Sequence, residues 1–141
     1  MSHLLDRLQS ILNAAARLVF SARRSECITQ LLCNLHWLRV PERIEFHLCV
    51  LAFRCLNASA PPYLAESVRQ TADVEGRRHL RSSTTMTLVV PSVQQSTLGD
   101  CAFPVAASWA WNSLPPVIRT VSSFTSFWQQ LKTHLFRLSF G

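Results

Sequence analysis

The sequence predicts a mainly α-helical fold, with five or six helices around one core and at most a short isolated strand or hairpin near 86–98. Apolar residues recur at helical spacing in several segments and leave polar residues on the opposite side. Most of the seven prolines stand where such a segment would begin or end. A chain of 141 residues that is 48% hydrophobic also matches one ordinary domain with a buried core.

A first amphipathic helix is expected over roughly residues 3–22. Arg17 lies on its polar stripe. Arg23 and Arg24 follow at the carboxyl end, where cations complement the negative end of the helix macrodipole. The apolar face is formed by Leu4, Leu8, Ile11, Leu12, Ala15, Leu18 and Val19.

A second, shorter helix and a longer third helix follow. Thr29 can cap the second helix, and its apolar face holds Leu31, Leu32, Leu35 and Leu38. Pro41 is expected as the first residue of the third helix, with Glu42 in the first turn. This third helix is apolar nearly all round and should lie at the centre of the fold. Its expected core stripe is Ile44, Leu48, Leu51 and Cys55.

The second half of the chain contains shorter elements. Pro61–Pro62 begins a short helix through about Thr71, and Leu88–Val90 is a β-prone run without an obvious partner. Pro104 can begin a helix through Trp111, which Pro115–Pro116 ends. A last helix follows Ser122–Ser123, with apolar residues at helical spacing from Phe124 to Leu138.

Changes in composition predict three parts. Residues 1–71 form a helical bundle, and residues 72–98 form a basic loop or linker that includes the short strand. Residues 99–141 form a C-terminal helical segment that packs on the first part.

The charge favours a polyanionic partner. The chain has fourteen Lys and Arg residues and eight Asp and Glu residues, which gives a net charge of +6. Only Lys132 is a lysine, and the planar guanidinium of arginine suits two-point contacts with phosphate. RNA or DNA backbone is therefore the expected partner. Codon bias in the gene is an alternative explanation for the arginines.

No membrane partner is expected, since the longest unbroken apolar run, 48–53, is far shorter than the roughly 20 residues that span a bilayer. Charged residues interrupt the segment 4–20, unlike the apolar centre of a signal peptide. We therefore expect an intracellular protein, in the nucleus or the cytoplasm, and not a secreted one. The five cysteines form an odd count, so free thiols are expected in place of a disulfide framework.

The sequence offers no catalytic residue and no cofactor. Its three glycines cannot build a phosphate-binding or dinucleotide-binding loop, and its three aspartates lie in unrelated segments. Cys33 and His36 could share a helix face, but two ligands do not make a zinc site and no C-x-x-C pair exists. Buried thiols explain the cysteines better, and core packing explains the four tryptophans better, although an exposed Trp128 could stack on a base. An enzyme is therefore not expected.

Several short strings, taken in order, resemble the region downstream of the polymerase palm in LINE-type non-LTR retrotransposon reverse transcriptases. They are Leu-Asn-Ala-Ala-Ala-Arg-Leu-Val (12–19), Leu-His-Trp-Leu (35–38), Ala-Pro-Pro-Tyr-Leu (60–64), Leu-Arg-Ser-Ser (80–83), Gly-Asp (99–100), Trp-Asn-Ser-Leu-Pro (111–115) and Leu-Lys-Thr-His-Leu-Phe (131–136). Together they extend over nearly the whole chain, and their order and spacing carry the resemblance.

The resemblance implies a thumb and a C-terminal extension, helical parts that grip template and primer and perform no chemistry. On this interpretation residues 1–71 are a thumb-like bundle, and the chain is a non-catalytic fragment of an RNA-directed DNA polymerase. The arginines expected to contact phosphates are Arg17, Arg23, Arg24, Arg77, Arg78 and Arg81. The alternative is that these arginines are solvated surface charges.

The departures from the resemblance indicate a decayed genomic copy. Similar sequences tend to carry arginine at eight positions of this chain, and single transitions in CGN codons convert arginine to Cys, Trp, His or Gln. The eight residues are Cys33, His47, Gln94, Gln95, Cys101, Trp109, Trp128 and Gln129.

Three hypotheses of function remain open. The first is a fragment with weak, sequence-independent affinity for nucleic acid. The second is a helical interaction module that self-associates or docks on a polymerase core through its apolar faces. The third is a remnant without a selected function.

Overall fold

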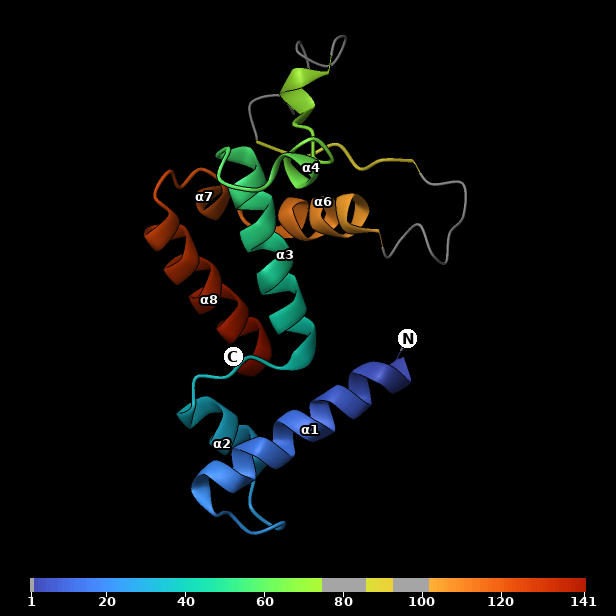
Figure 1. Cartoon of the computed structure of the whole chain (residues 1–141). Helices are drawn as coiled ribbons and strands as arrows, with labels where there is room; N and C mark the ends of the chain where they lie inside the picture. Colours follow the sequence, from blue (N-terminus) through green and yellow to red (C-terminus); the bar gives the residue numbers. More distant parts are fainter. Residues whose placement is uncertain (1, 75–85, 93–101) are drawn as a thin grey trace. The chain divides into compact units, whose positions relative to one another are not determined.

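A computed structural model of the chain describes residues 2–74, 86–92 and 102–141, and they form a mainly α-helical fold, as predicted (Figure 1). In these ranges the helices are α1 (Ser2–Phe20), α2 (Ile28–Asn34), α3 (Val40–Leu56), α4 (Pro62–Ala65), α6 (Phe103–Ser113), α7 (Pro116–Arg119) and α8 (Phe124–Phe140). A short 3-10 helix, η1, covers Thr71–Asp73. None of the helices within the described ranges is both long and apolar enough to cross a membrane.

The chain divides into two compact units. One consists of residues 1–46 together with 131–141, and the other of residues 47–130. This grouping differs from the predicted boundaries at 71 and 98, because the last eleven residues join the N-terminal segment.

The first unit has a small apolar core between α1 and α2. Ala16, Leu31 and Leu32 are buried in it, and Phe140 packs against them. Gln9 on α1 adds a polar link, because its side-chain oxygen accepts a hydrogen bond of 2.9 Å from the backbone N–H of Val40. The stripe of α1 around residues 9, 12 and 16 is therefore the one that packs inside this unit.

The second unit has an aromatic core. The rings of Phe53 and Phe127 stack with centroids 4.4 Å apart, and Trp111 lies 5.6 Å from Phe127. Large, rigid rings bury much apolar area at low entropic cost, so these side chains stabilise the unit strongly.

The β-prone run 88–90 does have a partner. Leu88 forms a single antiparallel bridge with Gln70, and backbone hydrogen bonds of 2.9 Å flank that bridge from Thr71 to Thr87 and from Val89 to Arg69. This segment, yellow in Figure 1, runs along α6, whose side chains also bond to its main chain.

Several predicted element limits differ from the observed ones. The first helix ends at Phe20, so Arg23 and Arg24 lie beyond its last turn. Cys27, in extended conformation, is the residue before α2, which places Thr29 inside the helix and not at its cap. The helix after Pro61 ends at Ala65, because the chain must extend to reach its bridge at Gln70.

The predicted core stripe of the third helix is also partly wrong. Ile44 is exposed, whereas Cys49, Ala52 and Phe53 are buried, so the buried face is rotated from the predicted one. Pro116, which was expected only to end the preceding helix, also begins α7, because its fixed φ suits the first turn of a helix.

Candidate nucleic-acid interface

The end of α1 turns the chain back on itself. Ser21 adopts a left-handed conformation with φ of 49°. The backbone N–H of Ala22 donates to the carbonyl of Arg17 at 2.9 Å, and the N–H of Ser21 donates to the carbonyl of Leu18 at 3.2 Å. These two bonds form a Schellman motif, which reverses the chain directly after the helix.

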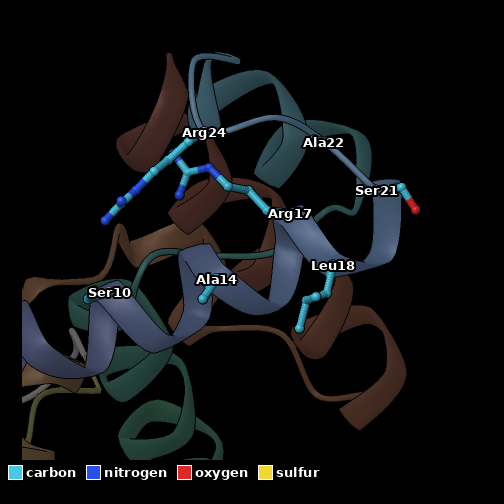
Figure 2. A pocket seen from close by; sticks show the side chains of 7 residues that line it. All are labelled: Ser10, Ala14, Arg17, Leu18, Ser21, Ala22 and Arg24. Atoms are coloured by element: carbon cyan, nitrogen blue, oxygen red, sulfur yellow. The ribbon is translucent and has the colours of Figure 1, made fainter.

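This reversal produces a pocket of about 600 Å³ that Arg17 and Arg24 both line (Figure 2). Ala14, Leu18 and Ala22 supply apolar walls. In Figure 2 the side chains of Arg17 and Arg24 extend toward the same side of the pocket, whereas Ser21 points the other way. Two of the three arginines predicted near the first helix are thus brought together.

Arg17 is half-buried, and its Nε has no hydrogen-bond partner among the residues described. A buried N–H of a guanidinium without an acceptor is costly, because it loses its hydration without compensation. Of the described residues that line the pocket, none is acidic. An anion in the pocket would therefore meet two guanidinium groups and no acidic side chain among the described lining residues.

The other predicted arginines are not in this pocket. Arg23 is exposed and does not line it, although its backbone N–H donates to a carboxylate oxygen of Glu26 at 2.8 Å and so holds the turn. Arg77, Arg78 and Arg81 lie outside the described residues.

Three further arginines interact with aromatic rings. The guanidinium carbon of Arg39 lies 5.3 Å from the centroid of Phe140. Arg43 lies over Trp37 and Arg54 over Phe124, at 5.9 and 5.4 Å. Cation–π pairing restrains these guanidinium groups, so they are less suited to a phosphate than Arg17 and Arg24.

Arg119 is a charged residue that the sequence did not single out. Only 7% of it is exposed, and its Nε and Nη1 have no hydrogen-bond partner in the ranges that the structure covers. No local pattern reveals such burial, because Arg119 follows two prolines on a four-residue helix that has no periodicity of its own.

The structure gives no indication of metal chemistry in the part that it describes. No group of three or more His, Cys, Asp or Glu side chains there could hold a metal ion. Cys27, Cys33, Cys49 and Cys55 form no disulfide bond, and Cys101 lies outside the described residues.

Comparison of the chain with protein-family models, curated protein sequences and solved structures found no match.

Proposed function

We propose that the chain is a non-catalytic C-terminal fragment of a retrotransposon-encoded RNA-directed DNA polymerase that binds nucleic-acid backbone weakly and without sequence preference. The observation that carries the binding is the pocket that Arg17 and Arg24 line together. The resemblance of seven ordered strings to the region downstream of the palm supplies the origin. The proposal includes no catalytic residue, metal or cofactor, and it implies an intracellular location, in the nucleus or the cytoplasm.

Guanidinium groups suit this role because they present several N–H donors in one plane and stay charged at any physiological pH. Contacts with phosphate oxygens carry no sequence information, and they release counterions when they form. Binding through a few arginines is therefore expected to be weak and strongly dependent on salt.

The proposed decay of the gene is supported by the exposure of the positions at which arginine is expected to have been lost. Of the eight, Gln94, Gln95 and Cys101 lie outside the described residues. His47, Trp109, Trp128 and Gln129 are exposed and Cys33 is half-buried. Arginine at the four exposed positions would keep its guanidinium group hydrated.

A salt titration tests the proposed function. A labelled single strand and a labelled duplex are titrated with the protein at about 50 and about 200 mM salt, and neutralising two duplex phosphates predicts a loss of affinity of roughly tenfold. Arg24→Gln should reduce the slope of log affinity against log salt by about one. Arg7→Gln removes the same charge from an exposed position on α1 outside the pocket and is the matched control. Affinity that does not change with salt would overturn the proposal.

A second candidate function, self-association, is favoured by the exposed apolar stripe of α1. Leu4, Leu8, Ile11 and Leu18 are all exposed, with Ile11 at 67% and Leu18 at 81%. Together with Ala15 they alternate spacings of four and three residues, the pattern of a two-helix seam. Antiparallel pairing of two copies would place Ile11 opposite its own counterpart and Leu4 opposite Leu18.

Light scattering at low and high salt separates the two candidates. An apolar seam predicts dimers that persist in high salt, because salt does not screen hydrophobic contacts. Ile11→Glu should convert them to monomers, whereas Ser10→Glu, one residue earlier on the polar side, should not. A protein that is monomeric at every salt concentration would exclude this candidate.

A further inference from the structure

We infer that the pocket between Arg17 and Arg24 takes a phosphate monoester at the end of a nucleic-acid strand in preference to the phosphodiesters within it. This inference rests on the proposed function and specifies which part of the nucleic acid occupies the site. Three properties of the pocket support it.

The first property is the limited extent of the site. A strand interior that runs over a protein surface needs a long groove or a basic ridge, whereas this site is an open hollow of about 600 Å³ whose lining residues all lie between Ser10 and Arg24. That volume falls within the range of roughly 300–1,000 Å³ typical of small-ligand sites. One terminal nucleotide matches such a volume.

The second property is the charge. Two guanidinium groups line the pocket, and no acidic residue does so among those described. A phosphate monoester carries about −1.5 to −2 charges near neutral pH and has three terminal oxygens, whereas a diester carries one charge and has two such oxygens. Two arginines complement the monoester better.

The third property is the apolar part of the lining. Ala14, Leu18 and Ala22 line the pocket together with the arginines. Leu18 is largely exposed on the turn before Ser21, so it can pack against the sugar or the base of a terminal nucleotide. A bare inorganic anion would leave this apolar lining unused.

The test compares single strands of one sequence that differ only at their ends. Strands with a 5′-phosphate, with a 3′-phosphate and with hydroxyls at both ends are titrated by fluorescence polarisation at fixed salt. At least one phosphorylated strand should bind about tenfold more tightly than the strand with hydroxyl ends, as two added charge-assisted hydrogen bonds imply. The comparison between the 5′ and 3′ strands identifies the end that is bound.

Variants and pH supply independent measurements. Arg24→Gln should abolish the preference for the phosphorylated strand, and Arg7→Gln should leave it intact. The preference should also grow between about pH 5.5 and 7.5 as the monoester loses its second proton near pH 6. The strand with hydroxyl ends, measured at each pH, corrects for titration of the protein itself.

The outcomes distinguish this inference from the proposed function. Equal, salt-dependent affinity for all three strands would overturn the inference and leave the proposed function intact.

Competition by a nucleoside monophosphate and by inorganic phosphate shows whether the pocket binds the nucleoside as well as the phosphate. The monophosphate should compete better, and equal competition would overturn the role of the apolar lining. Calorimetric binding of the monophosphate without binding of any strand would support the pocket and overturn the proposed function.

Discussion

The side-chain amide of Asn112 on α6 pairs with the main chain of Leu88 as a neighbouring strand would. Its Oδ1 accepts from the backbone N–H of Leu88 at 2.8 Å, and its Nδ2 donates to the Leu88 carbonyl at 2.9 Å. The indole N–H of Trp111 donates to the carbonyl of Met86 at 2.8 Å. The hydroxyl of Ser108, which has a single proton, lies 2.6 Å from the Pro104 carbonyl of its own helix and 3.2 Å from the Val89 carbonyl. One helix face thus satisfies the main chain of a segment that makes only one β-bridge within the described ranges.

Removal of this amide should destabilise the protein. Asn112→Ala leaves both main-chain groups of buried Leu88 without that partner, so we expect the free energy of unfolding to fall by about 1–3 kcal/mol. Asn112→Asp keeps the acceptor, loses the donor and should also destabilise. Urea unfolding measures both. Ser122→Ala, at an exposed position outside the helices, is the control and should change the value by about 0.5 kcal/mol or less.

Replacement of Ala58 by glycine should stabilise the protein. Ala58 follows α3 with φ of 52°, in a Schellman motif where Ser59 N–H donates to the Arg54 carbonyl at 2.9 Å. A left-handed conformation costs an L-residue roughly 1–2 kcal/mol, whereas glycine adopts it freely but loses about 0.5–1 kcal/mol of chain entropy. Ala58→Gly should therefore raise the free energy of unfolding by about 0.5–1 kcal/mol.

The control for this change is glycine inside a helix. Ala110→Gly lies within α6 and should lower the free energy of unfolding by about 1 kcal/mol. If both variants are destabilised alike in thermal or urea unfolding, then the conformation at Ala58 is not left-handed in solution.

The same geometry explains which helix limits could be predicted. Helix starts at Pro41, Pro61–Pro62 and Pro104 were within a residue or two of the observed starts, because proline fixes its own φ. The ends of α1, α2 and α3 were harder, because the left-handed residues there are Ser21, His36 and Ala58, and none of them is the glycine that usually marks such an end. A strand pattern does not predict the pairing of 88–90, because it combines one bridge to Gln70 with hydrogen bonds from side chains of α6.

The site was predictable only in part. Arginine clustering in the sequence indicated Arg17, Arg23 and Arg24 together, but it could not separate them. The turn at Ser21 makes that separation, because it directs Arg24 into the pocket and leaves Arg23 outside it. The spacing of charged residues does not predict that Ser21 adopts a left-handed backbone conformation.

The cysteines should differ in reactivity. The backbone N–H groups of Gln30 and Thr29, at the start of α2, lower the pKa of the exposed Cys27 thiol below its usual 9.0. Burial raises the pKa of the Cys55 thiol. Because the thiolate is the nucleophile, alkylation followed by mass spectrometry between about pH 6 and 9 should modify Cys27 before Cys55. Equal rates at the two residues would contradict this.

The raised pKa of Cys55 also has a consequence for stability. Above pH 9.0 the unfolded thiol loses its proton while the folded one retains it, so the folded state binds more protons and the free energy of unfolding falls as pH rises. Cys55→Ala should remove this part of the alkaline loss. Cys27 has the opposite sign, since its thiolate is favoured in the folded state.

Arginine at two exposed tryptophans should strengthen nucleic-acid binding. Trp109 is 52% and Trp128 39% exposed, and the resemblance assigns arginine to both positions. Trp109→Arg and Trp128→Arg should each increase affinity at low salt and steepen the salt slope by up to about one. Trp109→Gln and Trp128→Gln are the neutral controls, and an increase with glutamine equal to that with arginine would attribute the effect to removal of the indole.

Arg119 should be replaceable by an apolar residue of similar length. Only 7% of Arg119 is exposed, and its Nε and Nη1 have no hydrogen-bond partner among the described residues. Burial of an unpaired charge costs more than its stem contributes by packing, and apolar replacements of buried charges often stabilise by about 1–4 kcal/mol. Arg119→Met should therefore raise the free energy of unfolding, whereas Arg119→Lys keeps the charge and should not. Arg69→Met, on an exposed arginine, is the control for loss of charge alone. A loss of several kcal/mol in Arg119→Met would mean that this guanidinium has an anionic partner in solution.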